Sequence, residues 1–493
     1  MIDPLRTPTA ERADWHLRIR PGADAAFALG VAHEIFAHHW HDELWLEAYA
    51  RGWREYRDRA AGCPPERAAR LAGVTADDVR AFAALYAAPE SRPALVRLNY
   101  GLNRHANGAT QVRAVTLLPA LVGDWSRPGG GARLSTSGAF GLDKKALARP
   151  DLEPHPTRLL NMSRLGEILL EEDPPVRALF VYAANPATSN PDQANVRRGL
   201  AREDLFVVVH EQFPTDTARF ADVLLPATMQ MEHPDLHTAY GHYHLQLNRP
   251  AVPAAGECRS QVELFRALAK RMHLPHPCFD DTFEDLVRQA VGSGAPRLAG
   301  ITLERLEAER SVMLSAAKRV NGTYTPFLDG RFDTPSGKVE FVSSLMAGEG
   351  LDPILGALTA EEADPALAAE RERHPLHFVS PAGRYFLNST MVENETGRRL
   401  QKGPLLYLAP ADAEVRGIRS GDRVRVFNDR GSWTAVAEVG DLTGPGVVAT
   451  YRGWWSRFTA DGTNANQTTS QRLTDAGGGA TFYSNFVEVE RLG

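Results

Sequence analysis

The sequence predicts an α/β protein with two pseudo-symmetric parallel-sheet layers that bind dinucleotides, followed by a C-terminal β-barrel. Two observations predict this fold. A unit of strand, acidic turn, helix start and second strand occurs twice, near residue 1 and near residue 210, and beyond residue 374 the chain changes to short strands punctuated by Gly, Asp and Asn. Parallel strands need crossover connections, whereas short strands of this kind are typical of a compact barrel.

The repeated unit is clearest at 203–229, where the apolar run LFVVVH precedes Glu211. Such a run predicts a strand that is buried on both faces of a parallel sheet. A shift of roughly 208 residues brings the N-terminus onto this unit, so that Asp3, Thr7, Thr9, Ala10, Ala13, Asp14 and Leu17 match Glu211, Thr215, Thr217, Ala218, Ala221, Asp222 and Leu225.

The acidic residues Asp3 and Glu211 each stand at the carboxyl end of a strand. In open α/β sheets that edge binds nucleotides, because a helix N-terminus offers N–H groups to a phosphate and a carboxylate accepts from guanine or ribose. A lone carboxylate there is more often a solvated turn residue. The repetition favours a functional role for these two carboxylates and predicts that the protein binds two nucleotide-like groups.

The composition limits the classes of protein to which this chain can belong. A chain of 493 residues with 43% hydrophobic residues predicts about three domains with sizeable cores, and a net charge of -6 argues against nucleic-acid binding. No apolar run has the length of a membrane span, and no signal-peptide core follows Met1. Cys63, Cys258 and Cys278 are far apart, which fits a reduced, cytoplasmic protein without disulfides. The sequence leaves open whether an export signal lies upstream of Met1.

The start of the chain corresponds to the end of a strand. Ile2 and Asp3 match His210 and Glu211, so the first copy lacks nearly all of its own strand. A missing strand leaves an open sheet edge. We therefore expect an N-terminally incomplete chain, or a second chain that supplies the missing part.

The first α/β domain is expected over 1–130. Asp24 is predicted to be the N-cap of a helix, the segment to Tyr86 is helical, and a strand over 94–101 is followed by a polar turn and a helix near Ala109. Arg104 and His105 stand in that turn, which alone is equally compatible with an ordinary loop.

The second α/β domain, with a helical insert, is expected over 131–355. A Gly-rich loop at 127–141 lacks nucleotide-motif spacing. A strand begins at Ala178, and its polar loop contains Asn185 before a helix with Asn190 as N-cap and Pro191 at its first position. The region 263–316 reads as helical, and 356–372 as a charged connector.

Two groups of histidines raise the alternative of a metal site. The spacing from His33 to His41 lacks the i, i+4 pair of zincins, since position 37 is Ala. The second group, His233, His237, His242 and His244, has no partner at clear ligand spacing. Packing and surface roles are the simpler interpretation, and we name no metal ligand.

The C-terminal domain is expected over 374–493, as a barrel packed over the crevice between the two α/β layers. Its predicted strands are LHFVS, LLYLAP, DRVRVFNDRG, WTAVAEVG, GVVATYRGWW and FVEVE.

Seven phrases in order resemble the large subunit of molybdenum or tungsten bis-pterin oxidoreductases, the group that contains dimethyl sulfoxide reductases, formate dehydrogenases and nitrate reductases. The resemblance covers essentially the whole chain. The phrases are DPLRTPTAERADWHLRIRPGADAAFALG, NYGLNRHANG, LVGDWSRPGGGA, NPATSNPD, FPTDTARFADVLLPA, DTPSGKVEF and APADAEVRGIRSGDRVRVFNDRG.

The resemblance implies a molybdopterin-dependent enzyme whose cofactor is bis-molybdopterin guanine dinucleotide with Mo or W. The matching motifs assign Asp3, Thr7 and Asp24 to binding the guanosine end of one dinucleotide. They assign His210, Glu211, Asn185 and His233 to the guanosine end of the other. Near the pterins the resemblance places Tyr100, Asn103, Arg104, Gly383, Arg384, Ser389, Thr390, Asn466 and Tyr483.

The resemblance also implies an upstream region with a 4Fe-4S cluster and the metal-ligating residue, a small-molecule substrate, and an iron–sulfur or cytochrome subunit as electron-transfer partner. The expected reaction is a two-electron or oxygen-atom transfer. No catalytic residue is named, although Arg104, His105 and Arg133 are assigned to the substrate funnel. Two alternatives stay open: a nicotinamide-dependent dehydrogenase, and a non-catalytic cofactor-binding fragment or one chain of a split enzyme.

Overall fold

In the computed structural model, which describes residues 1–315, 319–320 and 323–493, the first unit is a set of helices built around α1 (Asp24–Ala37). The sequence DAAFALGVAHEIFA is apolar on most sides, and eleven of its fourteen residues are buried. At Gly30 an added Cβ would lie 2.3 Å from the Cβ of Ala68, so glycine permits the close contact with α4. The surrounding helices are α2 (Glu43–Tyr49), α3 (Trp53–Ala61), α4 (Pro65–Ala72), α5 (Ala76–Ala87) and α6 (Gly108–Leu121).

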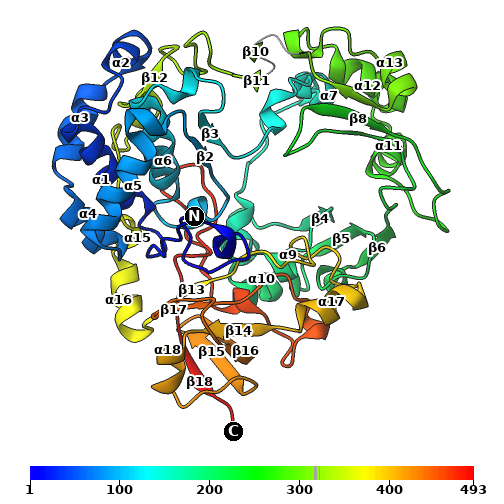
Figure 1. Ribbon diagram of the computed structural model, residues 1–493. Helices are drawn as coiled ribbons and strands as arrows, with labels where there is room; N and C mark the ends of the chain where they lie inside the picture. The colour runs from blue at the N-terminus through cyan, green and yellow to red at the C-terminus, as the bar shows by residue number, and fades with distance from the viewer. Residues whose placement is uncertain (316–318, 321–322) are drawn as a thin grey trace.

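Short parallel strands accompany these helices. Strand β2 (Leu95–Arg97) pairs with β3 (Gly131–Arg133), and β1 (Ala50–Arg51) pairs with β12 (Val339–Glu340). Phe341 and Leu358 are buried in the core of this first unit. The end of the region expected as the second domain, 131–355, therefore packs with the first unit (Figure 1).

The second unit contains a three-stranded parallel sheet in the order β4–β5–β6. Three helices contribute to the buried core on one face of this sheet: α8 (Leu165–Glu171), α9 (Pro186–Ser189) and α10 (Gln193–Leu200). Helix α11 (Gln261–Arg271) contacts the other face through Phe265. The helix α10 begins after Asp192, whose side chain accepts from Asn195 N, so the expected cap at Asn190 was wrong. The strands are β4 (Ala178–Tyr182), β5 (Phe206–Glu211) and β6 (Val223–Pro226).

Burial on both faces of β5 was correct only toward its carboxyl end, where His210 is buried on the face that also carries Phe206. Val207 and Val209 are fully buried, but Phe206, on the opposite face, is 51% exposed. Tyr182 on the neighbouring strand is 50% exposed, because α11 covers only part of this face. The apolar run therefore did not show whether the strand is buried on both faces of the sheet or on one face only.

The sequence repeat is also a structural repeat. Ile2 pairs with Leu17 in a parallel bridge, and His210 pairs with Leu225 in the parallel register of β5 and β6. Adding 208 to each member of the first pair gives the second. The turn hydrogen bonds repeat as well: Thr7 Oγ1 accepts from Ala10 N at 3.2 Å, and Thr215 Oγ1 accepts from Ala218 N at 3.3 Å. The two strand ends are thus equivalent positions.

A smaller lobe lies at the upper right of Figure 1. Its antiparallel sheet packs Leu245 and Val312 against Leu306. The region expected to be helical to residue 316 ends in a strand, β9. The lobe contains β7 (Asp235–His237), β8 (His244–Asn248), β9 (Ser311–Met313), α7 (Lys144–Ala148), α12 (Phe283–Val291) and α13 (Leu303–Glu309).

The predicted C-terminal barrel is confirmed, and it closes in the order β13–β17–β14–β16–β15–β18. Its interior is apolar, with Phe378 against Trp433, and β15 alternates exposed and buried residues. The strands are β13 (Leu376–Val379), β14 (Leu405–Leu408), β15 (Arg423–Asn428), β16 (Gly431–Val439), β17 (Val447–Ala449) and β18 (Phe486–Arg491).

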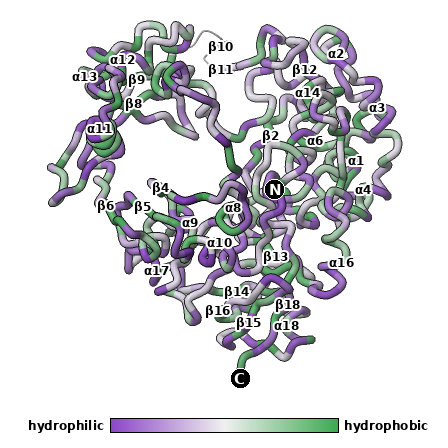
Figure 2. The backbone as a smooth tube through the Cα atoms, turned by 180° about the vertical axis from the view of Figure 1, so that it is seen from behind, coloured by the Kyte–Doolittle hydropathy of each residue, from purple (hydrophilic) through white to green (hydrophobic). Residues whose placement is uncertain are grey.

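Short elements complete the described chain. The expected connector contains α15 (Ala360–Ala363) and α16 (Ala366–Arg373), and Figure 2 shows α16 from behind, beside the barrel. The others are β10 (Arg319–Val320), β11 (Thr323–Tyr324), α14 (Ser344–Gly348), α17 (Glu395–Gln401) and α18 (Pro410–Glu414).

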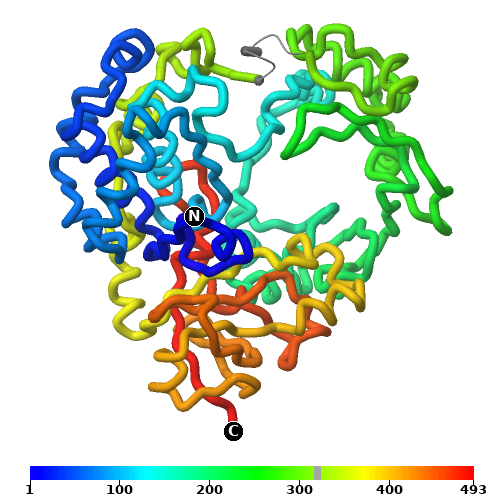
Figure 3. Tube along the Cα trace, in the orientation of Figure 1, coloured from blue at the N-terminus to red at the C-terminus, as the bar shows by residue number. Residues whose placement is uncertain are grey.

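The barrel contacts both α/β units. The N-terminal segment lies beside it in Figure 3. Leu5 bridges Thr443, and Arg6 N donates to Leu442 O at 2.8 Å. Helix α6 of the first unit is capped from the barrel domain: the carboxylate of Asp475 accepts from Ala109 N at 2.8 Å and from Thr110 N at 3.0 Å. The residue at the N-cap position itself, Asn107, makes no capping bond. Asp475 thus satisfies N–H groups that a helix leaves free at its start.

None of the helices in the described part of the chain has the length and apolarity needed to cross a membrane.

Candidate functional site

Two carboxyl groups lie close together at the N-terminal strand end. Asp3 Oδ1 accepts from Leu5 N at 2.8 Å, and Asp24 is the first residue of α1, with Ala23 rather than Asp24 at the N-cap position. Burial raises the pKa of Asp24 to about 7, opposed by a backbone hydrogen bond, and the charge of Asp3 raises it further. Burial also raises the pKa of Asp3. No ion pair joins either carboxyl to a Lys or Arg of the described residues, so both have acceptor capacity for an external donor.

The turn after β2 brings polar side chains next to the barrel. Arg104, at the end of this turn, is half-buried, and its carbonyl accepts from Tyr483 N at 2.9 Å. His105 is buried against His377 and Tyr483, with ring centroids 6.0 and 5.7 Å away, and burial holds its pKa well below the usual value.

A cavity of about 230 Å³ opens at the carboxyl ends of β2 and β3. Tyr100 and Asn103 line it, and Arg133, assigned to the funnel with Arg104 and His105, lines it too. Tyr100 lies against Tyr240, with ring centroids 6.5 Å apart. The crevice at the ends of parallel strands is the usual ligand position in such sheets.

The equivalent edge of the second unit holds a buried amide. Asn185 follows β4 and is 5% exposed; its Oδ1 accepts from Thr217 N at 3.2 Å and from Thr217 Oγ1 at 2.8 Å. Its Nδ2 donates to Thr188 Oγ1 at 3.1 Å. Asn185 therefore joins the loops that follow β4 and β5.

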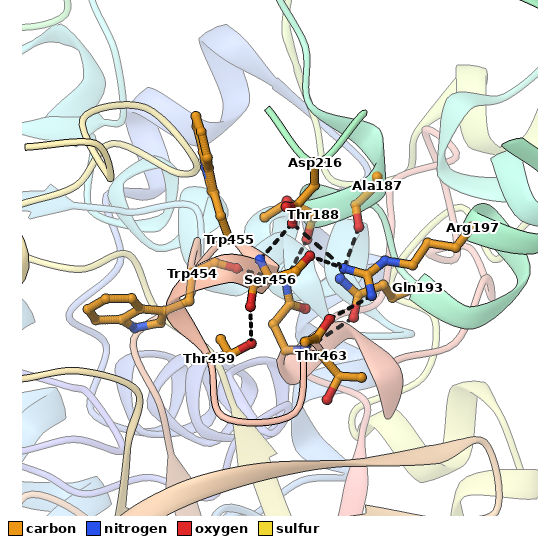
Figure 4. Close-up of polar contacts among 12 residues, drawn as sticks. Ala187, Thr188, Gln193, Arg197, Asp216, Trp454, Trp455, Ser456, Thr459 and Thr463 are labelled. Carbon is orange, nitrogen blue, oxygen red and sulfur yellow. Dashed lines mark hydrogen bonds and ion pairs between the residues drawn. The ribbon is translucent and has the colours of Figure 1, made fainter. Parts of the chain in front are cut away.

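Asp216, beside this amide, connects the second unit to the barrel (Figure 4). Its Oδ2 accepts from Thr188 Oγ1 at 2.7 Å and from Ser456 N at 2.8 Å, with Arg197 at 3.6 Å. Arg197 also donates to Ser456 Oγ at 2.7 Å. Asn466 Nδ2 donates to Thr188 O at 2.9 Å, which places this predicted residue in the same contact region.

The remaining predicted residues of the second unit surround the end of β5. His210 is buried, and its Nε2 lies 3.0 Å from Arg259 O. Burial raises the pKa of Glu211, and a hydrogen bond from Gln212 N opposes this. His233 Nδ1 lies 2.9 Å from Thr228 Oγ1. Glu211 therefore occupies the position of Asp3 and shares its raised pKa.

The loop after β13 lies against the segment that follows β17. Ala382, next to Gly383, bridges Arg452, and Arg384 N donates to Gln401 Oε1 at 3.2 Å. The Ser389 carbonyl accepts from Trp455 Nε1 at 2.9 Å, and Thr390 closes a small turn with Leu387. The segment Tyr451–Ser456 thus contacts this loop on one side and Asp216 on the other.

Sequence reasoning missed Asp216 and Arg452. Asp216 lies inside the repeated unit, but its match in the first copy is Pro8, so the repeat did not select it. Arg452 was absorbed into a predicted strand, whereas β17 ends at Ala449. The run YRGWWS, with a Gly among aromatic residues, was the available signal for a contact loop.

The chemistry of the site suits a ligand with N–H donors, because Asp3, Asp24 and Glu211 are carboxyls whose pKa is raised by burial. A guanine presents a ring N–H and an amine to such acceptors. Within the described ranges no three His, Cys, Asp or Glu side chains gather as a metal site.

Two family models match the chain. The model "Molybdopterin oxidoreductase" matches residues 1–271, and "Molydopterin dinucleotide binding domain" matches 376–486. The probable oxidoreductase YoaE of Bacillus subtilis is 40% identical over 494 residues, which cover 100% of this chain and 70% of that protein. Dimethyl sulfoxide reductase DmsA of Escherichia coli is 27% identical, covering 100% and 67%. Among solved structures, acetylene hydratase from Pelobacter acetylenicus has a TM-score of 0.81 at 23% identity, covering 100% of this chain and 73% of that one, and so shows the same fold.

Proposed function

The chain belongs to the molybdopterin oxidoreductase family, and from this premise we propose that it holds the cofactor of an enzyme that transfers two electrons or an oxygen atom to or from a small substrate. The cofactor is a molybdenum bis-molybdopterin guanine dinucleotide. When bound, it supplies the redox chemistry, while the protein supplies binding, orientation and electrostatics.

The observation that carries the proposal is the equivalence of Asp3 and Glu211. Asp3 follows the parallel bridge of Ile2 with Leu17, and Glu211 ends β5; both have pKa values raised by burial, and they are related by the repeat. Two equivalent buried acceptors suit two equivalent guanines. Asp24 adds a second acceptor in the first unit, and Asn185 holds the corresponding loops together in the second.

The proposed roles of the other predicted residues follow from their places. Tyr100, Asn103 and Arg133 line the cavity next to the barrel, where they would orient the pterin end and admit substrate. Gly383, Arg384, Ser389 and Thr390 belong to the loop after β13, which would hold the pterins from the barrel domain. Thr7, His210 and His233 shape the turns around the guanosine ends. His105 is buried with a pKa well below the usual value, which fits a packing role better than proton transfer.

The proposed substrate is a small oxygen-containing molecule such as a sulfoxide or amine oxide. Dimethyl sulfoxide reductase DmsA and trimethylamine-N-oxide reductase of Haemophilus influenzae are similar to this chain, at 27% and 26% identity. Each oxygen atom removed requires two electrons, so we propose a redox protein with an iron–sulfur or haem centre as donor. Three separated cysteines fit a reducing compartment such as the cytoplasm.

The test is a cofactor inventory on protein expressed from its complete gene in a host that makes the cofactor. We expect two guanine nucleotides released per molybdenum, together with reduction of dimethyl sulfoxide or trimethylamine N-oxide by reduced viologen. One nucleotide per metal would contradict the role of the duplicated site. A correct inventory without turnover on either compound would contradict the substrate class alone.

A further inference from the structure

The hairpin between β7 and β8 of the smaller lobe is fixed at its tip, residues 238–243, beside the end of β3. Thr136, which follows β3 and is buried, donates from Oγ1 to Ala239 O at 2.6 Å, and the same oxygen lies 3.2 Å from His242 O. The backbone N of Thr136 donates to Tyr240 O at 3.3 Å. These bonds hold the tip by its backbone and leave its side chains available for other contacts.

Two side chains that line the cavity at the carboxyl ends of β2 and β3 contact this tip. Arg133 lines the cavity and donates to Gly241 O at 3.2 Å. Tyr100 lines it as well, and its ring centroid lies 6.5 Å from that of Tyr240. A hydrogen bond with the side chain of Tyr240 raises the pKa of the Tyr100 hydroxyl, and partial burial adds to this rise. The tip of the hairpin and the cavity wall are thus in contact at two points.

Tyr240 lies where the cavity meets solvent. Tyr100 lines the cavity and is nevertheless 39% exposed, and Tyr240 beside it is 64% exposed, whereas Leu98 on the same wall is buried. The volume of the cavity, about 230 Å³, is smaller than the roughly 300 to 1,000 Å³ of pockets for drug-sized ligands. A ring at the rim of so small a cavity occupies space that an entering molecule needs.

We propose that Tyr240 is a specificity-determining residue, whose ring narrows the entrance of this cavity and excludes substrates with bulky groups. The inference rests on the proposed function for the identity of these molecules, sulfoxides and amine oxides, and on the contacts of the hairpin tip for the position of the ring. Tyr240 comes from the smaller lobe, whereas the lining residues come from the first unit. A change at Tyr240 therefore alters the width of the entrance and leaves the cavity wall as it is.

The test measures how fast thiol reagents of two sizes reach the inside of the cavity in the cofactor-free chain. Thr116→Cys supplies the target, because Thr116 lines the cavity from α6 and its hydroxyl donates to Val112 O of the same helix. Cys258→Ser and Cys278→Ser remove the partly exposed native thiols. Burial raises the pKa of the remaining thiol, Cys63, to about 11, so it reacts slowly. The reagents are methyl methanethiosulfonate and the bulky N-(1-pyrenyl)maleimide.

Tyr240→Ala should raise the rate of the bulky maleimide about tenfold and that of the methyl reagent less than about twofold, because only the larger reagent needs the space of the ring. Tyr240→Phe keeps the ring and loses the hydroxyl, so it should raise the rate of the maleimide about threefold, as for the loss of one hydrogen bond. Tyr182→Ala is the matched control, because Tyr182 is 50% exposed on β4 and is not among the residues that line this cavity.

Three results would overturn the inference. The first is an unchanged rate of the maleimide in Tyr240→Ala, and the second is an equal rise in Tyr182→Ala. The third is an equal rise for both reagents together with a lower melting temperature, which would mean that the substitution loosens the whole region. Tyr240 is largely exposed, so Tyr240→Ala should melt at the same temperature as its parent.

Turnover separates this inference from the proposed function, in protein expressed from its complete gene and loaded with cofactor. Tyr240→Ala should raise kcat/KM for methyl phenyl sulfoxide, relative to dimethyl sulfoxide, about tenfold. An unchanged ratio, with dimethyl sulfoxide reduced by both proteins, would overturn the role of Tyr240 and leave the proposed function intact. If neither sulfoxide is reduced while the thiol reagents respond as expected, the narrow entrance stands and the proposed substrate class fails.

Discussion

The carboxylate of Asp216 accepts a hydrogen bond of 2.8 Å from the backbone N–H of Ser456, which lies 240 residues further along the chain. Asp216 belongs to the second α/β unit, and Ser456 belongs to the barrel segment that also contains Arg452. The same barrel segment therefore contacts the second unit through Ser456 and the loop after β13 through Arg452, which bridges Ala382. Its position is set by the second unit and by the rest of the barrel domain together.

Replacing Asp216 by Ala should destabilise the protein by about 2 to 4 kcal/mol, because the change leaves the Ser456 N–H and the Thr188 hydroxyl without their acceptor and removes the carboxylate near Arg197. Chemical denaturation of the cofactor-free chain measures this free energy of unfolding. Asp151→Ala, which removes an exposed partner of Arg149, should leave the midpoint unchanged. Equal changes in the free energy of unfolding for the two substitutions would show that the hydrogen bonds of Asp216 contribute no more stability than an exposed ion pair.

Guanine binding should release a proton near pH 6. The pKa of Asp24 is raised to about 7, so this carboxyl is mostly protonated at pH 6, and only its ionised form accepts both N–H groups of a guanine. Guanosine titrations in buffers of different ionisation enthalpy should show close to one proton released, and affinity should rise with pH until about 7. Asp24→Asn should abolish the release, whereas the exposed Asp77→Asn should not. Proton uptake on binding would contradict the assignment.

The cofactor-free protein should lose stability below about pH 6.5 because of His105 and His377. Burial lowers the pKa of both rings, so the unfolded chain binds more protons than the folded one below the ordinary histidine pKa. Their contribution is fully present above that pKa and is lost as the pH falls, with a slope of up to about 1.4 kcal/mol per pH unit for each ring. Melting temperatures from pH 7.5 to 5.0 measure this slope.

The variant His105→Asn should flatten that pH dependence, and His38→Gln, on an exposed side chain, should not. A wild-type melting temperature that rises on acidification would give the opposite sign, which the raised pKa of Asp24 would produce if it dominated.

Asp475→Ala should weaken the start of α6 by about 1 to 2 kcal/mol, as for the loss of other helix caps. Hydrogen exchange should show the change as faster exchange at Ala109 and Thr110, with little effect on α5, whose cap is its own Thr75. Uniformly faster exchange throughout the first unit would mean that Asp475 acts by general packing instead.

The fold class could be predicted from the sequence because the patterns that indicate it involve residues close together in the chain. The repeat preserved the spacing between a strand end and the next strand, and the regular short strands punctuated by Gly, Asp and Asn identified the barrel. Helix starts were displaced by one or two residues, since Asp192 caps α10 with a left-handed φ of 56° that no pattern specifies. Phe206 was misjudged because exposure depends on how far α11 extends over the sheet.

The contacts that shape the candidate site were less accessible to sequence reasoning. Asp216 with Ser456 and Thr110 with Asp475 join residues separated by 240 and 365 positions, and neither pair has a motif. Individual acidic residues were found when they stood at a strand end, as Asp3 and Glu211 do. Residues that act between domains, such as Asp475, could be identified only from the arrangement of the three parts.

The cap that Asp475 places on α6 also constrains the order in which the chain matures on the ribosome. Thr110 is made 365 residues before Asp475, and at about 5 to 20 residues per second this interval lasts roughly 20 to 70 s. During that time the first turn of α6 has N–H groups that only water can satisfy. The first turn of α6 therefore reaches its final hydrogen bonds only after Asp475 has been translated, although its own residues emerge much earlier.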